Sequence, residues 1–177
     1  MLEKNRQMLL SPLNGTIVSL QEVSDPVFSS YMMGRGFAVK PKDGRMCSPV
    51  KGTVTSVAES KHAYVIKTQS GMEMLIHVGL DTVYLEGKPF KCAVKSGDKV
   101  KVGDLLCSID LDMIRDKGVD TIVPITFPKL SSDSEISIAY GEAKIGDKIM
   151  SIVNREIKRT AGNGFFRKNK IAHQAAK

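Results

Sequence analysis

The sequence predicts an all-β protein: a compact antiparallel β-sandwich or barrel with internal duplication and one short helix. Two repeats carry this prediction. Ser-Pro-Leu-Asn-Gly-Thr at residues 11–16 returns as Ser-Pro-Val-Lys-Gly-Thr at 48–53, and Lys-Val-Gly-Asp at 101–104 returns as Lys-Ile-Gly-Asp at 144–147. Paired repeats with glycine at the turns are typical of β-rich folds with two similar halves. The short spacing of the strand patterns also favours antiparallel pairing, because parallel strands need long crossover connections.

The ordered elements follow a short N-terminal lead-in at residues 1–9. One helix is predicted at Leu111–Lys117, where Gly118 ends it. The domain is expected to span residues 10–157, with a basic tail at 158–177. The predicted strands, in chain order, are 15–20, 36–40, 52–58, 62–68, 72–78, 105–109, 119–127 and 136–139.

The charge of the chain is unevenly placed. The 177 residues carry a formal net charge of +7, but residues 155–177 contain seven Lys or Arg against one acid. The rest of the chain is therefore nearly neutral, which argues against a nucleic-acid partner. With 42% hydrophobic residues the chain can bury one substantial core.

The basic tail has two interpretations. We prefer a solvated, disordered segment, because it is polar and lacks strand alternation. The alternative is a weak contact with anionic membranes, in which Phe165 and Phe166 sit beside Arg167, Lys168 and Lys170.

The cysteines and the apolar segments predict a cytoplasmic protein. Cys47, Cys92 and Cys107 are odd in number and contain no Cys-x-x-Cys pair, which fits reduced thiols better than a disulfide framework. No segment approaches the roughly 18 uninterrupted apolar residues of a membrane span, and the N-terminus lacks the pattern of a signal peptide.

The stretch from His62 to Asp81 predicts a hairpin that brings two of the three histidines together. A two-residue loop at 69–70 would place His62 directly opposite His77, and a loop at 70–71 would make them diagonal neighbours. Both registers put the two rings on one face of the hairpin.

A histidine pair has a chemical and an ordinary interpretation. A neutral imidazole has one free ring nitrogen that can attack phosphorus or bind a metal. In an arbitrary hairpin, however, two such rings are more often core or rim residues with backbone partners. Gly79 and Asp81 after His77 favour the chemical interpretation, because glycine admits a close approach and a carboxylate can orient an imidazole or attract a cation.

The sequence from residue 75 to 83, Leu-Ile-His-Val-Gly-Leu-Asp-Thr-Val, resembles the active-histidine signature of the glucose-type IIA component of the bacterial phosphoenolpyruvate:sugar phosphotransferase system. The resemblance runs from about Ser11 to Val153. It also includes the segments 11–15, 25–28, 36–41, 48–53, 59–63 and 97–104.

This resemblance implies a phosphohistidine carrier, a phosphotransferase component of sugar uptake. His77 would take the phosphoryl group from the phosphocarrier protein HPr and pass it to a membrane-associated IIB domain. His62 would steady the group, and Ser60 stands where the family has a hydroxyl that hydrogen-bonds the pair. No cofactor or metal is implied, and some relatives regulate transporters or kinases when unphosphorylated.

The resemblance also implies a docking surface for these partners. It is an apolar collar that excludes water, with acids that attract a basic carrier. For the two methionines, ordinary core packing is an equal alternative. The corresponding positions are Asp25, Val27, Phe28, Met32, Met33, Val78, Gly79 and Asp81.

Two other functions compete with this one. His77-x-x-x-Asp81 matches the first ligand motif of lysostaphin-like zinc hydrolases, although the required downstream His-x-His is missing, and His62, His77 and Asp81 would leave an open fourth zinc position. A biotinyl or lipoyl carrier domain would need a lysine at the hairpin tip, where this chain has Glu73.

Overall fold

A computed structural model describes residues 6–154 of the protein. The strand pairs that it forms are antiparallel, which confirms the predicted fold class. Eight strands make the largest sheet, in the order β13 (Gly141–Ala143), β2 (Gly15–Ser19), β3 (Arg35–Pro41), β11 (Val123–Phe127), β7 (Glu73–His77), β6 (Ala63–Thr68), β5 (Gly52–Val57) and β9 (Lys99–Val100).

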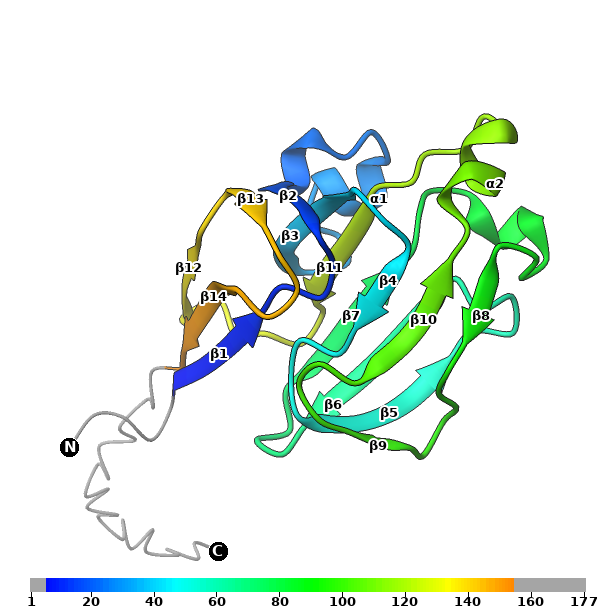
Figure 1. Ribbon diagram of the computed structural model, residues 1–177. Helices are drawn as coiled ribbons and strands as arrows, with labels where there is room; N and C mark the ends of the chain where they lie inside the picture. Colours follow the sequence, from blue (N-terminus) through cyan, green and yellow to red (C-terminus); the bar gives the residue numbers. More distant parts are fainter. Residues whose placement is uncertain (1–5, 155–177) are drawn as a thin grey trace, which may run out of the picture.

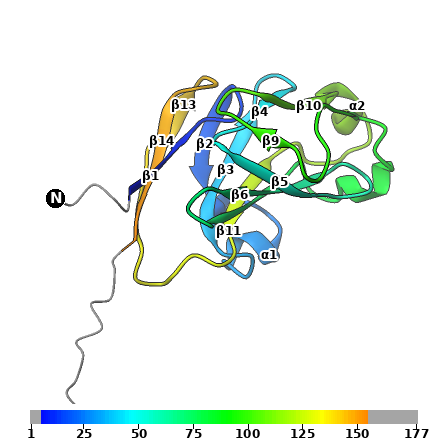
Figure 2. The same cartoon turned by 90° about the horizontal axis from the view of Figure 1, so that it is seen from below.

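Two three-stranded sheets complete the fold (Figure 1). Figure 2 shows β4 and β10 on one side and β5 and β6 on the other, while β1 and β14 lie at the end of the molecule that carries β2 and β13. The core fills the space between these layers. The small sheets are β4 (Arg45–Cys47), β10 (Leu105–Ile109) and β8 (Phe90–Cys92), and β1 (Arg6–Leu10), β14 (Lys148–Val153) and β12 (Glu135–Ile138).

The predicted duplication is present in the hydrogen bonds. Leu10 N–H donates to the carbonyl of Pro49, and Cys47 N–H donates to that of Pro12, at 3.2 and 2.9 Å. Residues 10 and 47, like 12 and 49, are equivalent in the repeat, so the two Ser-Pro turns bind each other reciprocally. The second repeat joins the first in the same way, since Ser11 and Ser48 donate to the carbonyls of Asp147 and Asp104.

The helices are short, and there is one more than the sequence analysis predicted. The predicted helix is confirmed as α2 (Leu111–Asp116). An additional helix, α1 (Pro26–Ser29), begins after Asp25, whose carboxylate caps the N–H of Val27 at 2.9 Å. Proline at the first helical position after an acidic cap is a recognised helix start, and four residues are too few for periodicity to reveal. Two 3₁₀ turns, η1 (Leu20–Glu22) and η2 (Thr82–Leu85), complete the helical elements within residues 6–154.

Two predicted boundaries are wrong in the described part of the chain. Residues 6–9, predicted as part of a lead-in, belong to β1, which pairs with β14. The strand predicted at 119–127 begins only at Val123, because Gly118 has a positive φ and the segment before β11 is irregular. The tail and its predicted membrane contact lie outside the described residues. Among the helices of residues 6–154, none is long and apolar enough to cross a membrane.

A second, smaller apolar cluster packs next to His77. Phe28 of α1 and Leu80 after β7 pack there with residues from β2, β3 and the chain before β11. This cluster lies at the end of β7, next to the side chain of His77, and is separate from the main core. This small cluster thus gives one side of His77 an apolar cover at the end of β7.

Candidate functional site

The hairpin formed by β6 and β7 is present, but both predicted registers are wrong. Ala63 pairs with His77, which shifts the register by one residue from each alternative. The loop has three residues, Gln69–Gly71, closed by the Thr68 N–H to the Met72 carbonyl at 2.9 Å. Gly71 has φ 84°, as expected when a three-residue hairpin loop ends in a left-handed residue.

The two histidines nevertheless meet, with ring centroids 5.0 Å apart and ring planes at 75°. In this register a continuous strand would send the side chains of His62 and His77 to opposite faces. His62 lies just outside β6, however, and Lys61 before it has φ 57°, so the regular alternation of the strand does not extend to His62. The backbone still closes the hairpin end, because Val78 N–H donates to the carbonyl of His62 at 2.7 Å.

One ring nitrogen of His77 is fixed by the backbone. Its Nδ1 lies 2.7 Å from the carbonyl oxygen of Gly79. A carbonyl only accepts hydrogen bonds, so Nδ1 carries the proton and donates it. In the neutral ring Nε2 then has a free lone pair, as a nucleophile requires.

The turn after His77 needs glycine at position 79. Gly79 has φ 72°, and a Cβ there would lie 2.4 Å from Cγ2 of Thr82 and 2.7 Å from the carbonyl oxygen of Asp120. The turn is also tied to the neighbouring chain, because Leu80 N–H donates to that same carbonyl of Asp120 at 3.0 Å. The carbonyl that orients His77 is therefore held in one place.

Burial is the main electrostatic influence on His77. Desolvation lowers its pKa, and the hydrogen bond to Gly79 and the negative charges of Asp25 and Asp81 act in the opposite direction. Phe28 covers the ring, with centroids 5.2 Å apart. The net lowering of the pKa keeps the imidazole of His77 neutral near pH 7.

His62 is also kept neutral, but its Nδ1 lacks the hydrogen bond that Nδ1 of His77 has. Desolvation lowers its pKa, and the neighbouring charge of a protonated His77 lowers it further. Its Nδ1 is buried without a hydrogen-bond partner in the described structure. The hydrogen bond expected from Ser60 to the histidine pair is not formed there: Ser60 instead lines a small surface cavity with Glu59, Val83 and Glu86.

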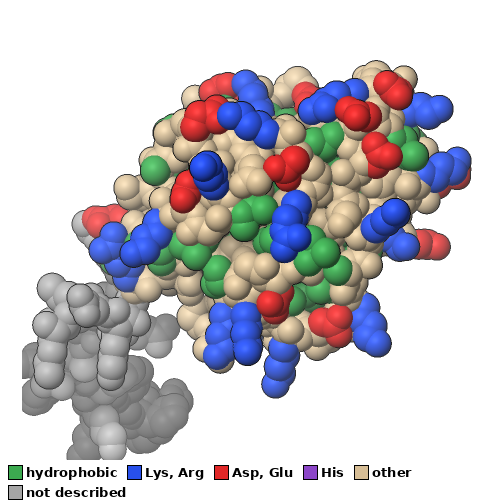
Figure 3. Space-filling view, in the orientation of Figure 1, with side chains coloured by type: hydrophobic (Ala, Val, Ile, Leu, Met, Phe, Trp, Pro, Cys, Tyr) green, Lys and Arg blue, Asp and Glu red, His purple; other side chains and the backbone are tan. Residues whose placement is uncertain are grey.

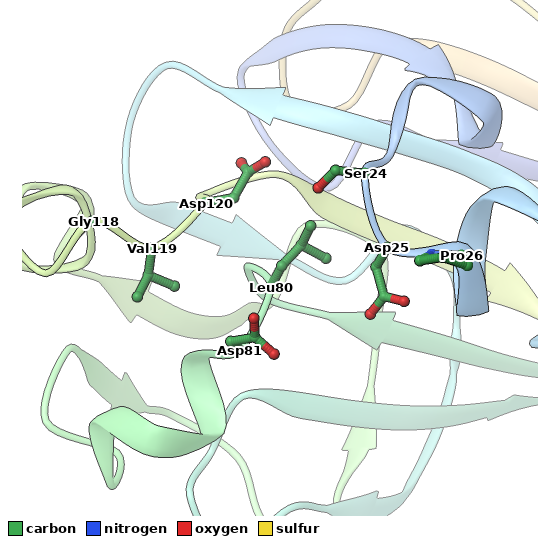
Figure 4. Close-up of a pocket in the computed structure, with 8 residues that line it drawn as sticks. All are labelled: Ser24, Asp25, Pro26, Leu80, Asp81, Gly118, Val119 and Asp120. Atoms are coloured by element: carbon green, nitrogen blue, oxygen red, sulfur yellow. The ribbon is translucent and has the colours of Figure 1, made fainter.

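An acidic cavity of about 520 Å³ lies at the turn that follows His77, where Leu80 and Asp81 line it. Asp25 before α1 and Asp81 before η2 line it, and these are the two carboxylates that act on the pKa of His77. Figure 4 shows that they come from separate chain segments, Asp81 directly after Leu80 and Asp25 just before Pro26. Asp120 lines the cavity as well, with its Oδ1 accepting the N–H of Ile122 at 2.8 Å.

Comparisons with known proteins now identify the family. Residues 7–132 match the profile of the family described as phosphoenolpyruvate-dependent sugar phosphotransferase system, EIIA 1. The chain belongs to this family.

Three similar proteins are of the glucose type. The glucose-specific EIIA component of Oceanobacillus iheyensis is 43% identical over 148 residues, covering 82% of this chain and 90% of the relative. That of Halalkalibacterium halodurans is 46% identical over 119 residues, covering 67% and 69%. The solved glucose permease IIA from Mycoplasma capricolum has a TM-score of 0.80 and 37% identity, with 84% of this chain and 96% of that chain covered.

Some relatives are much longer than this chain. The glucose-specific EIICBA component of Streptococcus pneumoniae is 52% identical over 117 residues, which cover 66% of this chain but only 16% of the relative. These findings confirm the resemblance to the glucose-type EIIA family, and with it the assignment of this chain as a phosphotransferase component of sugar uptake.

The EIIA structure places the predicted docking residues in two groups. Those with accessible side chains are Val27 and Met32, the latter 75% exposed, together with Asp81 and, in part, Asp25 and Met33. The others are buried: Phe28 covers His77, Val78 belongs to the main core, and Gly79 is packed in its turn. Partner contact at Phe28, Val78 and Gly79 stays a prediction, and for Phe28 and Val78 it requires the buried side chain to become accessible.

Three exposed apolar residues near the site were missed by sequence reasoning. Tyr31 follows α1, while Val83 and the 79% exposed Tyr84 lie in η2. The signal available was the run Thr-Val-Tyr-Leu directly after Asp81, but a strand or a buried turn fits that run equally well. In the structure η2 is flanked by two left-handed residues, Asp81 with φ 59° and Glu86 with φ 56°.

The alternative functions find no support. Within residues 6–154, no three His, Cys, Asp or Glu side chains come together as a metal site, so His62, His77 and Asp81 do not assemble the three-ligand zinc site. The family match likewise gives a zinc hydrolase no support. Glu73, predicted at a carrier-type tip, lies in β7 and pairs with Lys129 at 2.8 Å.

Proposed function

We propose that His77 accepts a phosphoryl group from HPr and passes it to the IIB domain of a sugar permease, with His62 and Ser60 as its catalytic neighbours. The observation that carries the proposal is the 2.7 Å contact between Nδ1 of His77 and the Gly79 carbonyl, beside a second imidazole. Relatives whose names join EIIC, EIIB and EIIA in one chain support a IIB partner. HPr as the donor rests on the family resemblance.

The free nitrogen decides the chemistry at His77. Nε2 attacks the phosphorus in line, so that a new N–P bond forms while the donor's N–P bond breaks and its electron pair returns to the donor histidine. The Nδ1 proton stays against the Gly79 carbonyl throughout. Since no proton has to move, the step is readily reversible, as a carrier requires.

His62 supplies charge stabilisation. Because its buried Nδ1 has no donor or acceptor nearby, the less costly neutral form carries the proton on Nε2. That N–H donates to an oxygen of the phosphoryl group on His77. Ser60, two residues earlier in the chain, acts as a positioning residue once its hydroxyl turns to donate to Nδ1 of His62.

The surface around the site fits basic partners with an apolar contact area. Asp25 and Asp81 attract cationic side chains to the cavity next to His77. Met32 and Tyr84 provide the apolar part, which excludes water from a labile phosphohistidine. The same surface, when unphosphorylated, also serves regulatory binding to transporters or kinases.

The test is phosphorylation by phosphoenolpyruvate, enzyme I and HPr. Wild-type protein gains one acid-labile phosphate, as measured by intact mass, and His77→Ala gains none. Loss of the imidazole removes the nucleophile, so the expected effect is complete loss. His173→Ala is the matched control, because it removes the third histidine from the chain and leaves the proposed site intact. Acid-labile phosphate on folded His77→Ala protein would contradict the proposal.

A further inference from the structure

A second charged cavity lies at the opposite end of the β6–β7 hairpin. It has a volume of about 410 Å³. In residues 6–154 none of its lysines forms an ion pair or a side-chain hydrogen bond. Figure 3 shows several Lys or Arg side chains along the lower edge of the molecule, where β6 and β9 run in Figure 1. The charged residues that line this lysine cavity are Lys51, Lys67, Lys99, Lys101 and Asp104.

Strand register brings two of these lysines to one face. Thr53 of β5 pairs with Lys67 of β6 on one side and with Lys99 of β9 on the other. Directly paired residues in an antiparallel sheet point to the same face, and two strand spacings separate the lysines by about 10 Å at their backbones. Lys51 and Lys101 approach from the turns before β5 and after β9.

The nearby acids do not neutralise this cluster. The carboxylate of Asp104 accepts the backbone N–H of Lys101 at 2.8 Å, which closes the turn. Glu73 lies opposite Lys67 on β7, and its pKa is lowered mainly by its hydrogen bond to Lys129, with which it pairs at 2.8 Å, and less by the charge of Lys67. The cavity therefore carries three more positive than negative charges among its lining residues.

The duplication supplies an internal comparison for this charge. The repeat-related cavity, also of about 410 Å³, is lined by residues of the other Ser-Pro and Lys-x-Gly-Asp turns. There Asn14 occupies the position of Lys51, and Glu142, which pairs with Thr16, occupies the position of Lys99. Glu142 forms an ion pair with Lys42. The lining of the related cavity thus has two lysines against three acids, whereas the lysine cavity has four lysines against one acid.

We propose that the lysine cavity binds a small anion with two or more phosphate groups. Lysine ammonium groups are flexible point charges that suit phosphate oxygens, and the cluster contains no arginine for bidentate carboxylate recognition. Two lysines about 10 Å apart at the backbone can each reach a separate phosphate of one ligand. Such a ligand supplies the negative charge that Glu142 supplies in the related cavity.

The lysine cavity is distinct from the histidine site. His62 lies just before β6 and Lys67 lies near its other end, about 17 Å apart along the chain direction. The proposal therefore does not depend on phosphoryl transfer at His77. The phosphate groups belong either to a soluble compound or to lipid headgroups, and the experiment distinguishes these sources.

The experiment uses inorganic tripolyphosphate as the soluble probe and vesicles containing cardiolipin, a lipid with two phosphate groups, as the lipid probe, at low ionic strength. With tripolyphosphate, the amide resonances of Gly52, Thr53 and Val100 shift in the wild-type NMR spectrum. Lys67→Gln/Lys99→Gln weakens the binding of whichever probe is recognised at least tenfold. The thermal midpoint of the wild type rises with that probe, and the variant loses this rise.

The matched control removes the same number of charges from the related cavity. Lys42→Gln/Lys144→Gln has the same net charge as the test variant and retains the same basic tail, and we expect it to bind like the wild type. Tripolyphosphate binding with this pattern identifies a soluble ligand, and vesicle binding with this pattern identifies a lipid headgroup. Equal weakening in both variants, or no binding of either probe to the wild type, overturns the proposal.

Discussion

The two ends of the β6–β7 hairpin lie in opposite physical environments: the histidine end is partly buried, and the loop end is exposed and positively charged. At the histidine end, imidazoles lie half-buried beside Phe28, and desolvation lowers the pKa of both. At the loop end, exposed lysines surround an open cavity, and Gly71 has no atom near the place where a Cβ would lie. A nucleophile that must stay neutral needs burial and fixed partners, whereas charges that attract an anion need only exposure and register.

The largest effect is expected on phosphoryl transfer at the histidine end, when the imidazole of His62 is removed. His62→Gln should still accept phosphate on His77, within a few-fold of the wild-type rate, because the nucleophile and its Gly79 contact remain. Passage of the phosphoryl group to a IIB domain should become roughly 10²-fold slower, since one donor to the transferring group is lost. Rapid-quench transfer from phosphorylated protein measures this step. Wild-type transfer by the variant would remove His62 from the mechanism.

The two glycines at the ends of the hairpin allow a sharper test of stability. Gly79→Ala should lower the free energy of unfolding by about 2–4 kcal/mol, because a left-handed alanine adds strain and its Cβ collides with Thr82 and Asp120. Gly71→Ala, with φ 84° but open space, should cost about 1 kcal/mol. Urea denaturation measures both changes. Equal losses would show that the turn at Gly79 tolerates a Cβ and does not hold His77 rigidly.

The smallest expected effect is the pH dependence of stability. Below about pH 6.5 the unfolded chain protonates both imidazoles, while the native pair stays neutral to lower pH because its pKa values are lowered. The unfolded state then binds more protons, so the free energy of unfolding decreases as the pH falls from about 7.5 to about 5.5. In His62→Gln/His77→Gln this decrease should be shallower in urea titrations at each pH. A steeper decrease would mean that a native charge stabilises the pair.

The sequence was sufficient to predict the fold class and the contact between His62 and His77. It was not sufficient to predict the hairpin register and the backbone conformation that produce this contact. Repeats and short strand patterns predicted the duplicated antiparallel fold, because they report directly on periodic backbone structure. The register failed because a left-handed Gly71 allowed a three-residue loop, which competes closely with two-residue loops. His62 meets His77 only because Lys61 leaves the regular strand conformation, and nothing in the residue types marks that position.

The exposure of single side chains on the predicted docking surface could not be predicted from the sequence either. A family motif identifies positions but not which of them face solvent. Val78 follows the active histidine in the chain and is fully buried, while Tyr84, outside the motif, is largely exposed. Such outcomes depend on the local turn at Asp81, whose positive φ is uncommon for residues other than glycine and is not marked by the sequence.

The reciprocal hydrogen bonds of the two Ser-Pro turns bear on how the chain can be divided. Each turn exchanges a backbone hydrogen bond with the other, through Leu10 with Pro49 and Cys47 with Pro12. A polypeptide cut in the exposed loop after β3 would therefore leave two pieces that are each incomplete. Mixed together, the pieces should reassemble by complementation, and neither should fold by itself.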